Sequence, residues 1–286
     1  DRVLVRITPQ QLILGLVTSM EFLVSVLLLI IALVVAWQFG YGIPVVAALL
    51  PLALGVVSLI SRRVITQFNY TLAETGGIHQ RAETGGGQQG EPTGLRISRG
   101  LTSLSSQSVP LDRIQGVRIQ QSWLWRRLKF HRVDIEVLGY GRGGEDQKQS
   151  SSMLFPVATT DQVRIAMRYL LPGAEDETIP LQPVDRRAVW LRPLSARTLR
   201  WGANDKVLVS EGGLLVFTRD TVPHAKTQSV RVTQGPLQRR LGVASVHVDT
   251  TPGPVDFVIP HLSADTARAV FERQLPAAAY ARRAGL

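Results

Sequence analysis

The amino-acid sequence predicts a membrane α-helical hairpin followed by two mainly-β domains, each a small β-sandwich or barrel capped by a C-terminal helix. Three observations predict this architecture. Apolar residues are concentrated before Ser61, although the 286-residue chain has a net charge of +10. A motif in the remainder occurs twice, at a constant offset of 113 residues. Short β-forming stretches, separated by Gly, Pro, Asn and Ser, dominate both copies of this motif.

The first element is a long apolar segment. Between Leu12 and Ile60 the only charged side chain is Glu21. A polar, glycine-containing break after Trp37 divides the segment into two predicted helices. The second helix, Ile43 to Ile60, has 18 residues, and at about 1.5 Å per residue such a helix is about 27 Å long and crosses the hydrocarbon layer. We expect a first span of matching length, preceded by a helical extension over residues 9–19.

The flanking charges predict the orientation of this hairpin. Two arginines lie within the first six residues, Arg62 and Arg63 follow the hairpin, and the turn carries no charge. The positive-inside rule therefore places both ends of the chain in the cytoplasm. Trp37 and Tyr41 suit the opposite interface as aromatic anchors.

Glu21 admits two interpretations. At the cytoplasmic interface, level with Ser61 and Arg62, it is a hydrated carboxylate. Alternatively, it is a buried intramembrane carboxylate that contacts a neighbouring helix or subunit. The second interpretation makes the chain a subunit of a membrane transporter or enzyme complex.

Two homologous segments follow the hairpin. Residues 109–128 and 222–241 are identical at ten of twenty positions. Such a repeat predicts two domains of about 100 residues each. The predicted division is residues 1–61 for the juxtamembrane segment and hairpin, 62–172 for the first domain, 173–183 for a linker, and 184–286 for the second domain.

In each copy several strands precede one helix. The first helix begins at Thr160 or Asp161 and ends before Pro172. The second follows a predicted N-cap at Ser263, and Pro276 is expected to end it. The predicted strands are 65–72, 95–99, 114–120 and 133–138 in the first copy, and 206–210, 214–218, 229–233, 244–250 and 255–259 in the second.

The residues that the copies share resemble a known family. The G-L turn, the strand V-P-x-x-(R/K)-x-Q-x-V-(R/K)-(I/V), the segment Q-x-x-L-x-R-R-L and the terminal helix resemble the bacterial PH-like domain family. Repetition after a hairpin is similar to its YdbT-type membrane proteins. The resemblance implies pleckstrin-homology-like folds, with two orthogonal sheets closed by one helix, in the bacterial inner membrane. It also implies a smaller YdbS-type PH-like membrane protein as a partner.

Basic residues exceed acidic residues in both predicted domains, by +6 in residues 62–172 and +4 in residues 173–286. The inner leaflet is negatively charged and attracts such domains. An aromatic and basic cluster in the first domain suggests an anchor that dips toward lipid. The candidate membrane-facing residues are Arg62, Arg63, Trp123, Trp125, Arg126 and Arg127.

The same cluster has two other interpretations. It is a segment that connects two strands, with Leu128 and one tryptophan in the core, or it is a surface for a partner. Arg239 and Arg240 repeat the basic pair in the second domain without the tryptophans. This repetition favours a structural role for the segment.

The sequence contains no pattern typical of catalysis or metal binding. The absence of Cys excludes disulfides and Cys-ligated zinc. The five histidines lack metal-ligand spacing. Asp134 and Glu136 share one face of a predicted strand, which we interpret as a solvated face rather than a catalytic pair. We therefore expect no enzymatic activity, no metal and no cofactor, and the positive-inside bias explains the basic composition without a nucleic-acid partner.

The predicted function is a non-enzymatic, membrane-anchored scaffold for protein–protein assembly at the bacterial envelope, with a role in export or in antimicrobial and stress tolerance. The expected partners are membrane lipids and either further copies of the chain or a smaller YdbS-type protein. Two alternatives remain open. One is a module that binds anionic lipid headgroups at the inner leaflet, and the other is the transporter or enzyme subunit.

Overall fold

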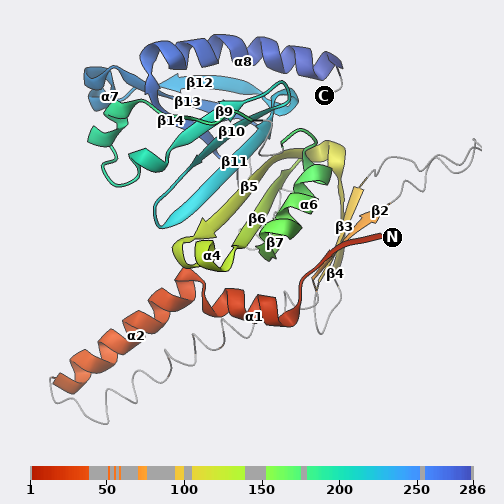
Figure 1. Ribbon diagram of the computed structural model, residues 1–286, viewed down its shortest axis with the longest axis vertical. Coiled ribbons are helices and arrows are strands. Elements are labelled where there is room, and N and C mark those ends of the chain that lie inside the picture. The colour runs from red at the N-terminus through yellow and green to blue at the C-terminus, as the bar shows by residue number, and fades with distance from the viewer. Residues whose placement is uncertain are drawn as a thin grey trace, which may run out of the picture.

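Two units of the same topology follow each other along the chain and lie against each other (Figure 1). The computed structural model describes residues 2–38, 51, 55, 58, 70–75, 94–99, 105–138, 153–174, 179–251 and 255–284. Each unit contributes four antiparallel strands, then three more antiparallel strands, then a helix. The structure therefore has the mainly-β architecture with terminal helices that the sequence predicts.

The first unit begins at the N-terminus, and α6 (Thr160–Leu170) ends it. A short helix, α4 (Trp123–Leu128), connects its fifth and sixth strands. The strands, in chain order, are β1 (Arg2–Arg6), β2 (Thr71–Thr75), β3 (Gly94–Arg99), β4 (Ser105–Pro110), β5 (Ile114–Ser122), β6 (Phe130–Val137) and β7 (Met153–Thr159).

The strand β1 was not predicted, because its residues were assigned to the segment 1–61 that precedes the first domain. In the structure β1 pairs antiparallel with β2. The N–H group of Ile7 also donates to the carbonyl oxygen of Tyr70 at 3.0 Å, and Val5 and Ile7 are buried in the core of the first unit. Residues 8–69 are thus an insertion between two neighbouring strands, and the two ends of this insertion lie side by side.

The insertion begins with α1 (Pro9–Val17). The hydroxyl of Thr8 caps this helix by accepting the N–H of Gln11 at 3.3 Å. The helix packs on β7 at Gly15, where an added Cβ atom would lie 2.5 Å from Cγ2 of Val157. Gly15 therefore permits a close approach that a larger residue would prevent.

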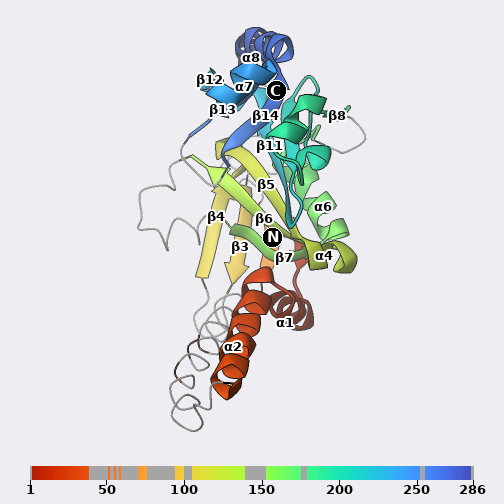
Figure 2. The same ribbon diagram turned by 90° about the vertical axis from the view of Figure 1, so that its left-hand side faces the viewer.

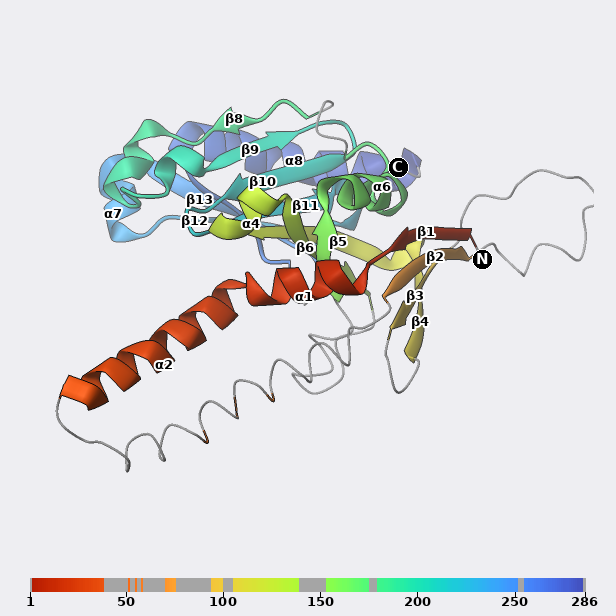
Figure 3. The ribbon, with the colours of Figure 1, turned by 60° about the horizontal axis from the view of Figure 1, so that its bottom comes forward.

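The next helix, α2 (Met20–Gln38), bends by 48° from α1 and projects from the molecule (Figures 1 and 3). In the part of the chain that the structure describes, no single helix is long and apolar enough to span a bilayer, but α1 and α2 together, as a bent pair, have the length and apolar composition of a span. The predicted second span, Ile43 to Ile60, lies outside the described residues apart from positions 51, 55 and 58.

The second unit repeats the first. Its connecting helix is α7 (Pro236–Leu241), and its last helix is α8 (Ala264–Ala284). Two 3₁₀ helices, η4 (Arg186–Trp190) and η5 (Ala196–Thr198), lie between its first two strands. The strands are β8 (Gln182–Pro183), β9 (Arg200–Ala203), β10 (Val207–Gly212), β11 (Val216–Pro223), β12 (Ser229–Thr233), β13 (Val243–Asp249) and β14 (Phe257–Ser263).

Repeated residues hold α4 and α7 in the same way. The side-chain amide of Gln121 donates to the carbonyl oxygen of Phe130, and that of Gln234 to the carbonyl oxygen of Val243, both at 3.1 Å. The residue that ends each short helix has a positive φ, 56° at Lys129 and 66° at Gly242. The conserved spacing of the two copies therefore reflects one local structure that occurs twice.

Pro276 does not end the last helix, contrary to the prediction. The helix α8 continues through Pro276 to Ala284, although an interior proline costs about 3 kcal/mol. Ala278 and Ala281 are fully buried, and Arg282 donates to the carbonyl oxygen of Thr227 at 3.0 Å. Packing of these final turns offsets the cost of the proline.

The two units share one sheet, because β5 of the first pairs antiparallel with β11 of the second. The resulting order is β7-β6-β5-β11-β10-β9-β8. Val207 and Val209 of β10 lie in the same apolar core as the first unit, together with Ala174 and Ile179 from the predicted linker. Two residues of the predicted linker, Ala174 and Ile179, are therefore buried in this core, whereas Gln182 and Pro183 form the exposed strand β8.

Candidate functional site at the junction of the two units

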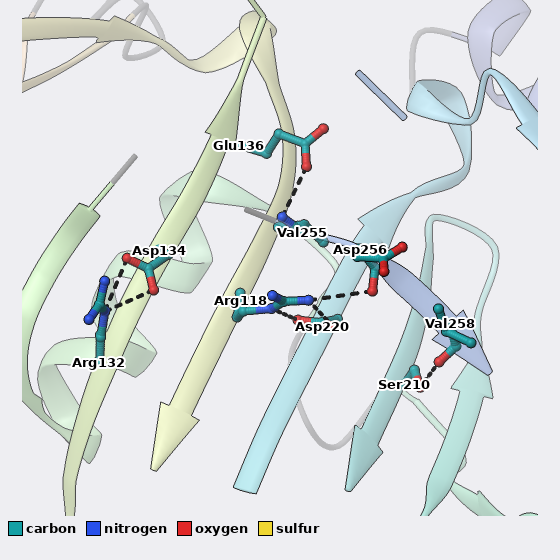
Figure 4. Close-up of polar contacts among 9 residues, drawn as sticks. All are labelled: Arg118, Arg132, Asp134, Glu136, Ser210, Asp220, Val255, Asp256 and Val258. Carbon is teal, nitrogen blue, oxygen red and sulfur yellow. Dashed lines mark hydrogen bonds and ion pairs between the residues drawn. The ribbon is translucent and has the colours of Figure 1, made fainter. Parts of the chain in front are cut away.

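A buried ion pair crosses the junction between β5 and β11. Nε and Nη2 of Arg118 donate to the two carboxylate oxygens of Asp220 at 2.7 and 2.8 Å (Figure 4). The hydrogen bond from Arg118 opposes the desolvation of Asp220, yet burial still raises the pKa of this carboxyl. The same hydrogen bond raises the pKa of Arg118. Such a two-pronged contact has strict geometry and aligns the two strands.

A second carboxylate of the first unit is held by the second unit. Glu136 on β6 is only 1% exposed. Its Oε1 accepts the hydroxyls of Thr250 at 2.7 Å and Thr251 at 3.1 Å. Its Oε2 accepts the N–H of Val255 at 3.3 Å (Figure 4). Desolvation by burial raises the pKa of Glu136. Three donors from one segment thus bind one carboxylate.

The segment that leads into β14 lies across the junction. The guanidinium of Arg118 also donates to the carbonyl oxygen of Asp256 at 3.4 Å, and the hydroxyl of Ser210 donates to that of Val258 at 2.6 Å (Figure 4). Residues 255–258 therefore contact β5, β6 and β10. The two units are held together by this segment, by the ion pair between Arg118 and Asp220, and by Glu136.

Asp134 and Glu136 do not form the solvated strand face that the sequence suggested. Asp134 is 5% exposed and accepts Nε of Arg132 at 3.0 Å, and burial raises its pKa. The alternation of β6 does place both carboxylates on one face, but the second unit covers Glu136, and Asp134 pairs with Arg132 of its own strand. Their oxygens accept hydrogen bonds from protein donors, an arrangement that suits structure rather than acid–base catalysis.

The helix α4 connects this junction to the insertion. Trp125 is 8% exposed, and its indole N–H donates to the hydroxyl of Thr18, between α1 and α2, at 3.1 Å. Its ring packs edge-on against Phe130 with centroids 6.3 Å apart. Trp125 is therefore the core tryptophan of this segment, whereas Leu128, expected to be in the core as well, is 37% exposed.

The remaining residues of the aromatic and basic cluster divide between the junction and the surface. Arg126 donates to the carbonyl oxygens of Gly213 at 3.1 Å and Leu214 at 2.8 Å, and lies 5.6 Å from the ring centre of Phe217. Trp123 and Arg127 are exposed. Of the four residues that the sequence grouped together, Trp125 is in the core, Arg126 is at the junction, and Trp123 and Arg127 are at the surface.

Other predicted residues lie elsewhere. Glu21 is exposed in the first turn of α2, and Trp37 is exposed near the end of that helix. Arg239 and Arg240 are exposed on α7. Tyr41, Arg62 and Arg63 lie outside the described residues.

A groove of about 630 Å³ lies between α8 and the strands β9 and β10 of the second unit. His224, which lines it, has one ring nitrogen 2.9 Å from the carbonyl oxygen of Asn204 and the other 3.0 Å from the side chain of Gln274. Both ring nitrogens of His224 are therefore hydrogen-bonded within the protein. Among the residues with described positions, no cluster of three or more His, Asp or Glu side chains could hold a metal ion.

The junction between the two units was not predicted from the sequence. The equivalence of Arg118 and Arg231 in the repeat was visible, but the two arginines have different partners, because Arg231 binds Asp249 at 3.1 Å within the second unit. The one available signal was chemical. An arginine that stands between two β-branched apolar residues in both copies indicates a carboxylate partner, without identifying which one.

Both units match the same model of a known protein family. A family model described as bacterial PH domain matches residues 89–171 and again residues 169–278. The two matches contain β3 to β7 with α6, and β8 to β14 with most of α8. No curated protein matches the chain significantly.

Proposed function

Because this chain belongs to the bacterial PH domain family, we propose that it is a non-enzymatic, membrane-attached scaffold whose tandem PH-like domains bind other proteins at the bacterial envelope. A bacterial PH domain suggests a module that binds proteins or lipids. The pairing of β5 with β11 is the observation that supports the proposal most directly, since one PH-like domain here already binds another through a sheet edge.

This pairing joins two different kinds of edge. β5 is the first strand of the three-stranded layer in its domain, and β11 is the last strand of the four-stranded layer in the other. Their repeat equivalents are β12 and β4, each of which pairs with only one strand among those described. Exposed edges of this kind accept a further strand. A partner PH-like domain, from another copy or from a smaller related membrane protein, fits the same arrangement.

Attachment to the inner membrane is part of the proposal. Apart from Glu21, α2 carries no charged residue in its 19 positions. Its large apolar side chains are exposed around the helix, and a helix that is apolar on all sides is typical of a membrane span or a buried core. The adjacent ends of the insertion, at Ile7 and Tyr70, support a segment that enters and leaves the membrane on one side, with both termini of this chain in the cytoplasm.

The test is the native mass of the full chain in mild detergent, with identification of co-purifying proteins. We expect an oligomer or a complex with a PH-like partner. Val232 on β12 is 40% exposed, and a lysine at an edge opposes strand addition, so Val232→Lys should release the partner. Ile165→Lys is the matched control, because Ile165 is also 40% exposed but lies on α6. A monomeric wild-type chain without a partner, or an unchanged Val232→Lys complex, would count against edge binding.

A role in export or in antimicrobial and stress tolerance belongs to the same proposal and depends on the partner that is found. The alternative of a transporter or enzyme subunit depends on Glu21. Glu21→Gln should leave complex formation through β12 unchanged if the scaffold proposal is right. Loss of the complex in this variant would favour an intramembrane contact.

A further inference from the structure

Four short segments share a composition that differs from the rest of the chain. They are α4, residues 186–198, the turn between β10 and β11 (residues 212–217), and α7. Together they contain eight arginines and no Asp or Glu. Six of their large apolar side chains are 44% to 81% exposed. We name the set the apolar–basic face, and its apolar members are Trp123, Trp190, Leu194, Leu214, Leu215 and Leu237.

Contacts join the four segments into one surface. The N–H of Trp123 on α4 donates to the carbonyl oxygen of Leu215 in the turn at 2.8 Å. The N–H of Gly213 in the same turn donates to the hydroxyl of Thr198 in η5 at 3.0 Å. The guanidinium of Arg187 in η4 lies beside Gly242, the residue that ends α7, because a Cβ atom built there would be 2.9 Å from Nη1.

This surface is continuous with the base of the helical insertion. The hydrogen bond between Trp125 and Thr18 links α4 to the bend between α1 and α2. In Figures 1 and 3, α4 and α7 lie on the side from which α2 projects, whereas the N-terminus and the end of α8 lie on the opposite side.

The repeat supplies an independent argument. In the first PH-like domain the connection between β1 and β2 contains the insertion of residues 8–69. The equivalent connection in the second domain, between β8 and β9, contains η4 and η5 with the exposed Trp190 and Leu194. The same position in the fold therefore carries apolar residues in both domains.

We infer that the apolar–basic face docks on the acidic lipid surface of the membrane that holds the insertion. Tryptophan and leucine side chains suit the depth of the headgroups. The exposed arginines at positions 127, 192, 239 and 240 suit the lipid phosphates. A purely apolar face would fit a protein equally well, but eight arginines, of which Arg187 pairs with the neighbouring Asp185 at 2.8 Å, leave an excess of positive charge that favours an anionic layer. The inference rests on the membrane attachment proposed above and is independent of the sheet edges.

The chain has no cysteine, so single cysteines allow a direct test in the full-length protein. An environment-sensitive fluorophore is attached at Leu194→Cys or Leu215→Cys, and the protein is reconstituted in vesicles of phosphatidylcholine and phosphatidylglycerol. Leu28→Cys on α2 reports insertion, and Glu272→Cys on α8 reports the far end of the molecule (Figure 2). We expect blue-shifted emission and quenching by brominated lipid at 28, 194 and 215, and quenching by aqueous iodide at 272.

The outcomes separate the inference from the proposal on which it rests. If the probe at 28 is in lipid but those at 194 and 215 are in water, docking of the face is excluded and membrane attachment stands. If the probe at 28 is also in water, the attachment itself fails. Shielding of 194 and 215 from both iodide and brominated lipid would show that a protein covers the face. As a charge test, Arg239→Gln with Arg240→Gln should reduce lipid quenching at 215 and leave it unchanged at 28.

Discussion

Arg118 and Asp220 are 102 residues apart in the sequence, yet they lie directly opposite each other where β5 of one domain meets β11 of the next. A shift of one residue between two strands reverses the face on which each side chain lies. The ion pair can therefore form in only one register of this pairing. It specifies how the two PH-like domains join.

Removal of one partner should destabilise the pair of domains. Asp220→Ala leaves the guanidinium of Arg118 in a largely buried site, and loss of one member of a buried pair costs about 3 kcal/mol. The measurement is the free energy of unfolding in denaturant for the full chain in mild detergent. Arg164→Ala is the control, since its pair with Asp161 is exposed and such pairs contribute about 0.5 kcal/mol. Equal effects of the two substitutions would contradict a structural role for the junction pair.

Glu136 should make stability depend on pH. Burial raises the pKa of Glu136 above its ordinary value of 4.5, so between that value and the folded-state pKa the native protein binds more protons than the unfolded chain. The free energy of unfolding must then fall as pH rises through this window. We expect the difference between wild type and Glu136→Gln, measured by denaturation at several pH values, to show this fall.

A second substitution tests the cause of that pH dependence. The hydroxyl of Thr250 donates to Glu136 and lowers the pKa of its carboxyl. Thr250→Val should therefore raise the pKa of Glu136 further, so that the free energy of unfolding continues to fall up to a higher pH. If the difference in free energy of unfolding from wild type does not change with pH for either Glu136→Gln or Thr250→Val, the carboxylate of Glu136 is not buried in solution.

Gly15 should be intolerant of substitution. An added methyl group would lie 2.5 Å from Cγ2 of Val157, and overpacking of this kind costs about 1–3 kcal/mol. Gly15→Ala should lower the midpoint of thermal unfolding and increase the hydrogen exchange of α1. Gly235→Ala is the control, because its nearest neighbouring atom would be 3.8 Å away. Equal exchange of α1 in wild type and Gly15→Ala would show that α1 does not pack on β7 as described.

Pro276→Ala should stabilise the second domain. The substitution restores an N–H group and removes a steric clash in the interior of α8, which is unfavourable by up to about 3 kcal/mol. The free energy of unfolding should rise, and hydrogen exchange in the last two turns should slow. Glu272→Ala, at an exposed position of the same helix, should change little. A loss of stability in Pro276→Ala would mean that the proline itself is needed to seat Ala278 and Ala281.

The repeat made most of the domain architecture predictable, because matching residues have matching roles. Gln121 and Gln234, for example, close the same hydrogen bond in each copy. The strand β1 could not be predicted, since five residues before an apolar segment carry no periodicity that distinguishes a strand from a flanking segment. The junction could not be predicted either. Arg118 and Asp220 meet only because β5 pairs with β11, and the sequence of neither strand alone specifies that pairing. Pro276 shows the same limit, where packing overrides a local helix-breaking signal.

The insertion between β1 and β2 has a consequence for the order of events during synthesis. The strand β1 leaves the ribosome first, but its partner β2 follows only after the whole helical segment has been made. Under the membrane attachment proposed above, the first domain cannot complete its sheet until the chain that follows the helical segment lies on the same side of the membrane as β1. In that case completion of the sheet acts as a check on topology, since a chain whose helical segment ended on the wrong side would leave β1 without β2.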